Sequence, residues 1–424
     1  MTLSLPRPTT SARTRDRFLD VVRSLAIVAV VAQHWTMPVL AYTDGRLTTG
    51  NALATPGWWV VTWLSQVMPL VFFAGGGANY LSLTRGGDAK AWLSARLTRL
   101  LLPVLPLLAV GVAAPPLLRT LGLPEQPVEL AGALSAQLLW FLGVYLLTVL
   151  ATPLLAAAHR RLRWAVPLGL AGLAVLVDLA RFSGVDYVGY VNAVFVWFAV
   201  HQLGFFYADG TLRRLSRRGA LALSAAGFTA TALLVGFGPY AESMIGMPGA
   251  PMSNMSPPAA VLVTLALGQV GLVLAARDAL IAWSERPTVA AALGWLGPRF
   301  MSVYLWHMPA LIVLSGVTVV GLGYATPAPG TVMWLATVPG WLLSAGAILT
   351  LLLRAFARFE MRPVPSPAVS PPSSARLCVA ALCGATGTLA LAATGFAAAP
   401  WPWIALLCGA YALTRVPARA VTSA

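Results

Sequence analysis

Three ionisable side chains lie on the first long apolar run of the chain, where a membrane-spanning helix makes them costly unless they are paired or hydrated. Asp20 and Arg23 stand near the start of this run, and His34 stands further along it. At about 100° per residue all three project from one helix face, and at about 1.5 Å per residue His34 lies roughly 21 Å from Asp20 along the axis. An imidazole can act near neutral pH as a general base or as a nucleophile. The three residues are therefore candidates for a catalytic site.

Each of these residues also has a structural interpretation. Asp20 and Arg23 could form a helix cap and an anchor at the membrane surface, and His34 could be a packed histidine bonded to a neighbouring helix. Their shared face favours a functional role for all three. Because Asp20 is far from His34 along the axis, we expect it to pair with Arg23 or with another cation at the cytosolic rim rather than to orient the ring.

Arg96 and Arg99 form a second candidate site. Residues three apart on a helix point to one side, and two guanidiniums there form a fork that suits phosphate groups. Pro103 and Pro106 follow and are expected to kink this helix, which leaves room for a ligand. The alternative is that the two arginines only set the membrane topology.

Aromatic, glycine and histidine residues in other apolar runs are candidates to line a substrate channel. Three consecutive glycines follow closely after the paired phenylalanines at 72 and 73, and they permit either very close helix packing, which we favour, or a narrow channel. His307 is predicted as a second proton acceptor or as the residue that orients the first histidine. The predicted channel residues are Phe73, Gly76, Gly77, Trp140, His201 and Tyr304.

No metal site is expected. His34, His201 and His307 have no ligand spacing that supports a shared ion, and the acidic residues are too few for a carboxylate cage. None of the motifs HExxH, CxxC, GxSxG or the P-loop occurs. The fourth histidine, His159, stands beside two arginines between apolar runs and is predicted as a solvated surface residue.

These candidates belong to a chain whose composition excludes a soluble globular protein and a disordered one. Of 424 residues, 58% are hydrophobic and only 10% are charged, whereas soluble domains are about 25% charged; the mean hydropathy is +0.78. The predicted fold is all-α, a polytopic transmembrane helical bundle of ten core spans plus a C-terminal two-helix hairpin. The predicted core spans are 19–41, 58–83, 100–118, 131–155, 164–180, 188–208, 220–238, 258–276, 300–322 and 331–353.

The expected organisation of the chain has four parts. A basic N-terminal tail covers residues 1–18, and the ten-helix membrane domain covers residues 19–361. A Pro/Ser-rich cytosolic linker at 362–376 then leads to the extra hairpin and tail at 377–424.

The distribution of basic residues predicts the topology. With the N-terminus in the cytosol, 25 of the 28 basic residues fall on the cytosolic side of the ten spans, as the positive-inside rule requires. The net charge of +15 is therefore attributed to topology in the lipid bilayer, and no nucleic-acid partner is expected. A single lysine among the basic residues indicates a GC-rich bacterial genome, so the expected location is the bacterial plasma membrane.

The order of these motifs resembles the acyltransferase-3 family of integral membrane acyltransferases. The resemblance covers roughly residues 17–360 and rests on Asp20-x2-Arg23-x10-His34, Phe72-Phe73…Gly77, Arg96-x2-Arg99 with Pro103, Leu139-Trp-Phe-Leu142 and Tyr304-Leu-Trp-His-Met-Pro309. The family commonly has Ser-Gly-Phe after the paired phenylalanines, whereas this chain has Gly76-Gly77-Ala78. Its members O-acylate cell-surface polysaccharides, lipid-linked sugars and some small metabolites.

The resemblance implies an activity and roles for several residues. Arg23 and His34 match the essential R-x10-H pair of the family, and Arg96 with Arg99 match its R-x-x-R motif, which is associated with acyl-CoA. The expected reaction moves an acyl group, with acetyl as the default, from cytosolic acyl-CoA to a hydroxyl of a carbohydrate, a lipid-linked sugar or a secreted metabolite. A proton-coupled transporter is the alternative, but transporters usually carry internal repeats and none is visible here.

Overall fold

The computed structural model describes residues 16–86, 88–250, 252–362 and 371–415. Within these residues, ten helical segments are long and apolar enough to cross a membrane, and the bent pair α11 (Val261–Ala275) and α12 (Arg277–Ser284) makes an eleventh candidate. A further apolar helix, α17 (Trp401–Leu413), is shorter. The predicted all-α, polytopic fold is confirmed.

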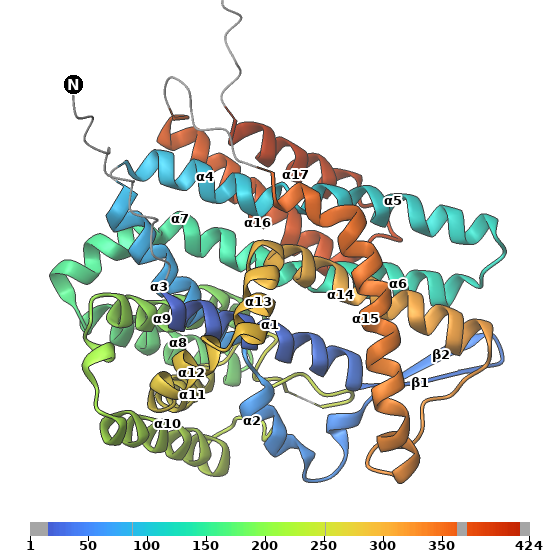
Figure 1. Ribbon diagram of the computed structural model, residues 1–424, viewed down its shortest axis with the longest axis horizontal. Helices are drawn as coiled ribbons and strands as arrows, with labels where there is room; N and C mark the ends of the chain where they lie inside the picture. Colours follow the sequence, from blue (N-terminus) through green and yellow to red (C-terminus); the bar gives the residue numbers. More distant parts are fainter. Residues whose placement is uncertain (1–15, 87, 251, 363–370, 416–424) are drawn as a thin grey trace, which may run out of the picture.

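The helices surround α1 (Arg17–Thr36), which runs through the middle of Figure 1. α3 (Met68–Gly86) and α9 (Asn192–Ala208) pack together, and α3 also contacts α1. In Figure 1, α10 (Arg217–Phe237) and α11 lie along the lower edge, and α4 (Ala89–Leu101) lies along the upper edge. The other helices are α2 (Thr62–Ser65), α5 (Val104–Thr120), α6 (Glu125–Gln137), α7 (Leu139–Leu162), α8 (Ala165–Phe182), α13 (Pro287–Leu296), α14 (Phe300–Ser315), α15 (Val332–Glu360) and α16 (Ser374–Thr394).

Short helical segments link several of these helices. They are the 3-10 segments η1 (Ala52–Ala54), η2 (Trp58–Val61), η3 (Asp186–Val191), η4 (Leu212–Arg214) and η5 (Gly297–Arg299), and the π-helical segment η6 (Gly316–Gly321). The η6 segment directly follows α14, so this span ends in a widened turn, a feature found often at functional sites.

The first span is shorter than predicted, because α1 ends at Thr36 rather than near residue 41. Pro38 lacks the N–H that would bond to the carbonyl of His34, and its ring crowds that carbonyl. The chain instead forms the antiparallel hairpin of β1 (Pro38–Thr43) and β2 (Arg46–Asn51). His34 therefore lies in the last turn of α1, next to the hairpin, rather than in the middle of a longer helix.

The turn of this hairpin is built from Asp44 and Gly45. Both have positive φ, at 51° and 77°, as a two-residue turn between right-twisted strands requires. The hairpin extends from the end of α1 at the right of Figure 1. We call this side of the bundle the hairpin end, defined by β1–β2 and the segments 122–124, 245–250 and 252–258. The opposite side is the arginine end, defined by Arg23, Arg96, Arg99, Arg163 and Arg213.

Glycines bring α3 and α9 into close contact. A Cβ on Gly76 would collide with the carbonyl oxygen of His201, and one on Gly204 would collide with that of Phe73. Without a side chain at either position the two backbones approach directly, as small residues allow in membrane helices. This packing fixes the second half of α9 against the middle of α3, which in turn contacts α1.

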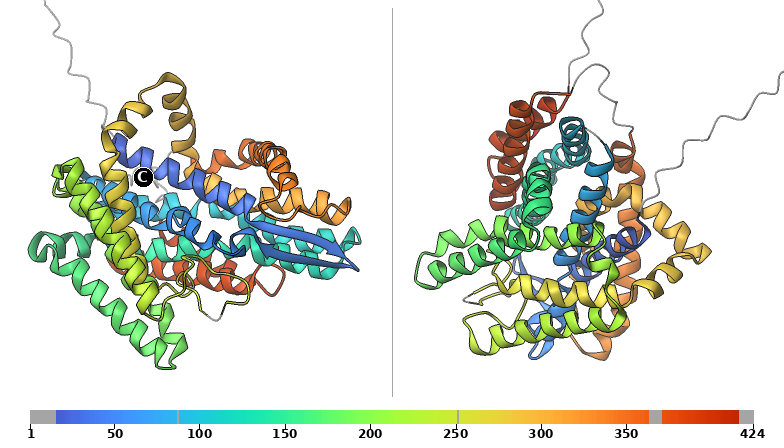
Figure 2. Two further views of the ribbon diagram at one scale, coloured as in Figure 1. Left: turned by 90° about the horizontal axis from the view of Figure 1, so that it is seen from below. Right: turned by 90° about the vertical axis from the view of Figure 1, so that its left-hand side faces the viewer.

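The C-terminal segment forms the hairpin α16–α17, which packs on α4, α6 and α7. Figure 2 shows it, in red, against one side of the bundle. The predicted linker at 362–376 and the predicted tail at 1–18 lie largely outside the described residues. The boundaries of the four predicted parts therefore stay predictions.

Candidate functional site

Two histidines from distant parts of the chain meet beside the hairpin end. The Nδ1 atom of His34 on α1 lies 2.9 Å from the Nε2 atom of His307 on α14. The two rings are nearly parallel, and their centroids are 5.2 Å apart. His307 is completely buried, whereas His34 is only half-buried.

The hydrogen bonds of His307 assign the protons of both rings. Its Nδ1 atom lies 2.7 Å from the carbonyl oxygen of Tyr304 and 3.3 Å from that of Val303. A carbonyl oxygen only accepts, so Nδ1 of His307 carries the proton and donates it. Nε2 of the neutral ring then accepts from Nδ1–H of His34, which leaves Nε2 of His34 unprotonated. The pair thus holds His34 in the form of a proton acceptor.

Two tryptophans hold the backbones around this pair. The indole nitrogen of Trp35 donates to the carbonyl oxygen of His307 at 2.9 Å. The indole nitrogen of Trp341 on α15 donates in turn to the carbonyl oxygen of Trp35 at 2.8 Å. Three helices, α1, α14 and α15, therefore fix the distance between the two imidazoles.

A cavity of about 1470 Å³ opens in front of His34. His34 lines this cavity and His307 does not, so only one imidazole of the pair is accessible to a ligand. Trp140 and Tyr304, two of the predicted channel residues, also line it. The cavity extends to the hairpin end, where its wall includes Asn51, Gly122, Tyr190, Ile245 and Pro257.

Two serines that the sequence did not single out also face this cavity. The hydroxyl oxygens of Ser65 and Ser315 are buried without a hydrogen-bond partner and both residues line the cavity. Serine is common on membrane helices, so nothing in the sequence marks these two. A buried hydroxyl without a partner is costly. The two oxygens have almost no accessible surface, so it is other atoms of these serines that form the wall.

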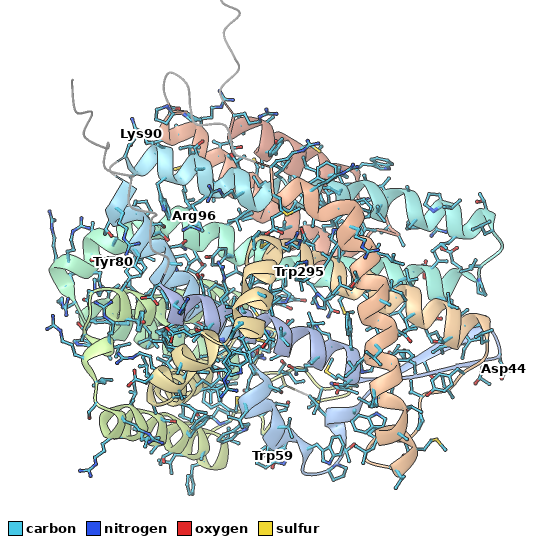
Figure 3. The ribbon with its side chains drawn as sticks, viewed as in Figure 1. Asp44, Trp59, Tyr80, Lys90, Arg96 and Trp295 are labelled. Atoms are coloured by element: carbon cyan, nitrogen blue, oxygen red, sulfur yellow. The ribbon has the colours of Figure 1, made fainter. Side chains whose placement is uncertain are left out.

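The two predicted phosphate-binding arginines lie at the arginine end. Nη2 of Arg96 donates to the hydroxyl of Ser82 at 2.7 Å and to the carbonyl oxygen of Ala78 at 3.4 Å, both on α3. Arg99 is exposed. Within the described parts of the chain, neither arginine forms an ion pair. Figure 3 shows Arg96 well away from Asp44 at the tip of the hairpin.

Arg23 adds a third positive charge at this end. Its Nη2 atom lies 3.4 Å from Oδ1 of Asp20, and its Nε atom is buried without a partner. The guanidiniums of Arg23 and Arg99 both repel that of Arg96, so the three charges lie within electrostatic range of one another. Such a group of guanidiniums suits an anion with several negative charges.

A row of aromatic rings stands between the cavity and Arg96. Tyr304 and Phe141 line the cavity, with ring centroids 5.1 Å apart. Phe141 lies 5.5 Å from Tyr145. The hydroxyl of Tyr145 accepts from the amide nitrogen of Asn79 at 3.3 Å, next to the carbonyl of Ala78 that Arg96 contacts. The hydroxyl of Tyr304 donates to the carbonyl oxygen of Leu138, the residue between α6 and α7. None of the three arginines lines the cavity.

The other predicted channel residues lie in helix packing. Phe73, Gly76 and Gly77 are buried on α3 and do not line the cavity in front of His34. The Nε2 atom of His201 lies 3.2 Å from the amide nitrogen of Asn79, inside the α3–α9 contact. The structure thus separates these four residues from His34, His307, Trp140 and Tyr304.

The described residues contain no group of three or more His, Cys, Asp or Glu side chains arranged to hold a metal ion. The geometry supports one kind of chemistry, proton transfer between Nε2 of His34 and a group that enters the cavity.

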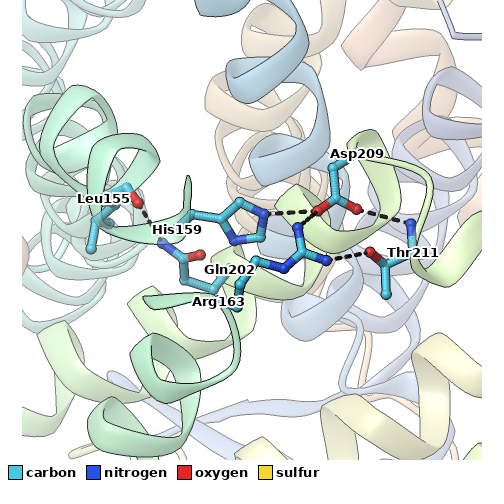
Figure 4. Close-up of polar contacts among 6 residues, drawn as sticks. All are labelled: Leu155, His159, Arg163, Gln202, Asp209 and Thr211. Carbon is cyan, nitrogen blue, oxygen red and sulfur yellow. Dashed lines mark hydrogen bonds and ion pairs between the residues drawn. The ribbon is translucent and has the colours of Figure 1, made fainter. Parts of the chain in front are cut away.

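The prediction that His159 is a solvated surface residue is wrong. Helix α7 continues to Leu162, so His159 lies in its last turn and is 1% exposed. Its Nε2 atom lies 3.0 Å from Oδ2 of Asp209, which Nη1 of Arg163 also contacts at 2.6 Å (Figure 4). The neighbouring arginines suggested a loop, but the helix turns this one side chain inward against α9.

Asp209 lies outside the membrane-spanning segments and is held by several donors. Burial raises the pKa of its carboxyl. Hydrogen bonds from the backbone and side chain of Thr211 and from His159, with the charge of Arg163, outweigh that effect, so the pKa of Asp209 lies below its usual value.

Comparison with known proteins agrees with this geometry. A family model described as an acyltransferase domain matches residues 16–353, which contain α1, both histidines of the pair and all three arginines. Neither the search of curated proteins nor the search of solved structures gave a match. The match is to a family of enzymes that transfer acyl groups, so it does not support the transporter alternative. The chain belongs to the acyltransferase-3 family of integral membrane acyltransferases.

Proposed function

We propose that this protein transfers an acyl group, with acetyl as the default, from cytosolic acyl-CoA to a hydroxyl of a carbohydrate, a lipid-linked sugar or a secreted metabolite. The observation that carries this proposal is the accessible Nε2 atom of His34, held unprotonated by His307 at the wall of a large cavity. The enzyme acts in the bacterial plasma membrane with its N-terminus in the cytosol, which the positive-inside distribution of charge supports.

His34 acts as the general base in this scheme. Its Nε2 atom takes the proton of the acceptor hydroxyl as the oxygen attacks the carbonyl carbon of the thioester. The tetrahedral intermediate collapses, the C–S bond breaks, and the departing thiolate takes the proton from the imidazolium. The acceptor leaves as an ester and the donor leaves as a free thiol. His307 is a positioning residue, because it keeps the proton of His34 on Nδ1.

The donor approaches from the arginine end. Arg23, Arg96 and Arg99 attract its phosphates, and the thioester arm extends toward His34. The rings of Phe141, Tyr145 and Tyr304 lie along this route, so they must turn aside to admit the arm. A change of side-chain rotamer, with loss of the bond between Tyr304 and the carbonyl of Leu138, would open this route without moving the helices.

The test is transfer of radiolabelled acetyl from acetyl-CoA in membrane vesicles that contain the full chain. We expect His34→Ala to lower transfer by about 10²–10⁴-fold, the usual contribution of a general base, with unchanged insertion and expression. Thr36→Ala is the matched control, because Thr36 lies on the same helix turn and does not line the cavity. Full activity of His34→Ala would refute the assignment, and label retained on the protein itself would indicate an acyl-histidine intermediate instead of base catalysis.

The same assay separates the donor site from the base. In Arg96→Ala with Arg99→Ala we expect a raised KM for acetyl-CoA at a nearly unchanged kcat, since the lost interactions are made equally in the ground and transition states. An unchanged KM would contradict the role of these arginines in holding the phosphates.

A further inference from the structure

We propose that the cavity in front of His34 binds a lipophilic alcohol, a molecule with a large apolar body that presents a hydroxyl to His34, and that α16 forms the wall that selects it. This inference deepens the proposed function and rests on it for the reacting group. It goes further by choosing one class among the possible acceptors and by giving the C-terminal hairpin a role.

The lining of the cavity is uncharged and mostly apolar. No described residue that lines it is Asp, Glu, Lys or Arg. Aliphatic side chains come from several helices, among them Leu118, Leu134, Met308, Leu311, Val320 and Leu389. A sugar chain carries hydroxyls on every ring, and each one buried needs a hydrogen-bond partner. A wall of this kind does not supply them, whereas it suits an apolar ligand.

Polar side chains form the smaller part of the wall. The side-chain oxygen of Asn51 accepts from the backbone nitrogen of Leu53 at 2.9 Å, and the amide nitrogen of Gln66 donates to the carbonyl oxygen of Met244 at 3.1 Å, so these two groups are already engaged. The other polar side chains of the wall, besides His34, include those of Gln33, Thr49, Gln137, Tyr190 and Ser256, and they stand among a much larger number of apolar residues. The cavity therefore suits a ligand that has few polar atoms on a large apolar body.

The volume also exceeds that of an ordinary small-molecule site. At about 1470 Å³ the cavity is larger than the roughly 300–1,000 Å³ typical of such sites. Its wall includes many residues other than those around His34, among them Leu47, Leu123, Ile245 and Pro257. The cavity accommodates a body that contributes binding but takes no part in the chemistry.

The cavity reaches the outer surface of the bundle along α14 and η6. Val313 and Val317 line it, yet they are 46% and 59% exposed. Both belong to the candidate span Pro287–Gly321, which is long and apolar enough to cross a membrane, so an opening of the cavity on this side leads to lipid rather than to water. A lipophilic alcohol can enter through this side directly from the bilayer.

Helix α16 completes the wall. Leu389, Ala392 and Ala393 line the cavity, although all three lie beyond residue 353, where the match to the acyltransferase family ends. The enzyme family therefore does not supply this part of the wall. In this chain the size and shape of the acceptor site depend on a segment added after the family domain.

The helices of the family domain are shaped to receive α16 and the turn that follows it. A Cβ on Gly143 of α7 would lie 2.7 Å from Cγ of Leu389, and one on Gly111 of α5 would lie 2.6 Å from the ring of Phe396. The backbone nitrogen of Phe396 donates to the carbonyl oxygen of Gly132 on α6 at 3.2 Å. Glycine at these contacts lets the hairpin approach closely, so Leu389 and its neighbours are held firmly at the cavity.

Photolabelling of the full chain in lipid nanodiscs tests this proposal without any acyl donor. The probe is a twelve-carbon alcohol that carries a diazirine, and the labelled peptides are mapped by mass spectrometry. We expect label in the peptides that contain residues 300–317 and 377–396. Excess dodecanol should displace it, and maltoheptaose at the same concentration should not.

Substitutions on α16 provide the matched variants. Ala392→Phe and Ala393→Phe fill the cavity and should lower the displaceable label at least about tenfold, within the range seen for small changes in an apolar pocket. Val379→Phe is the control, since Val379 is an exposed residue of the same helix outside the cavity. Leu389→Ala enlarges the cavity and should increase labelling by a longer alcohol, which keeps the test valid if the larger side chains prevent folding.

The outcomes separate this proposal from the function on which it rests. Equal displacement by maltoheptaose and dodecanol, or unchanged label in all three α16 variants, would overturn the lipophilic acceptor. If label maps to the cavity and His34→Ala transfers acetyl at the wild-type rate, the binding proposal stands and the role of His34 fails. If acetyl transfer needs His34 but the label lies elsewhere, the function stands and this inference fails.

Discussion

His34 and His159 are both bonded to a side chain of another helix, but their partners are of opposite kinds. His159 meets the carboxylate of Asp209, which also binds the guanidinium of Arg163. His34 meets a second imidazole, that of His307, whose other nitrogen already donates to a backbone carbonyl. One histidine is sealed in the protein, and the other lines a cavity.

This difference separates a histidine that holds the structure from one that can react. A carboxylate partner stabilises the charged form of an imidazole. The ring of His159 is also buried away from the cavity, so a ligand there does not reach it. A neutral imidazole partner adds no charge of its own, and by accepting Nδ1–H it leaves a lone pair on the far nitrogen of the first ring. The position of His34 at the cavity then makes this lone pair available. The partner and the access to a cavity distinguish the two sites.

Among the substitutions that test this comparison, those of His307 should change the rate of acyl transfer most. His307→Leu removes the acceptor for Nδ1–H of His34, and we expect kcat to fall by about 10²-fold, since the ring is no longer held in the proton-accepting form. His307→Gln keeps an acceptor oxygen and a donor nitrogen, so it should retain most of the activity. The measurement is kcat and KM for acetyl transfer with each variant.

The pH profile of the rate identifies a positioning role. If His307 only filled space, the two variants would lose activity equally and their profiles would match that of the wild-type chain. A positioning role requires that His307→Leu change the profile and that His307→Gln restore it. If His307→Leu and His307→Gln lost activity equally and had identical pH profiles, the positioning role of His307 would be refuted.

Parts of this site were predictable because they depend on local periodicity. Asp20 and Arg23 share a helix face in the sequence pattern, and the structure pairs them. The helical fold followed from composition and from the length of the apolar runs. Contacts within one helix are set by the spacing of residues along the chain, which the sequence displays directly.

Contacts between distant helices were not predictable in this way. His34 and His307 are 273 residues apart, and their hydrogen bond depends on how α1, α14 and α15 pack. The Asp44-Gly45 turn does carry a hairpin signal in the sequence, but the apolar run up to residue 41 outweighed it. The role of α16 at the cavity has no local signal, because its apolar residues would look the same on any lipid-facing helix.

Replacing His159 should give a smaller effect of a different kind. His159→Ala leaves a buried space and removes one donor from Asp209, so we expect a loss of stability of about 1–3 kcal/mol. The rate per folded molecule should not change. Thermal unfolding in detergent and the rate normalised to folded protein check both parts. A loss of kcat in well-folded His159→Ala would place this histidine in the chemistry and would abolish the distinction drawn between the two sites.

The smallest expected effect concerns the pH dependence of stability at Asp209. The pKa of this carboxyl lies below its usual value, which is about 3.9 in an unfolded chain. Its ionised form therefore stabilises the folded protein above about pH 4, and that contribution is lost as the pH falls through the folded pKa. Asp209→Asn removes the group, so its unfolding temperature should fall less than that of the wild-type chain as the pH is lowered from about 5 to about 3. Because Arg163 is half-exposed, solvent weakens the ion pair and keeps the difference small. Parallel curves for the two proteins would mean that the carboxylate does not stabilise this end of the bundle, and that His159 is held by packing alone.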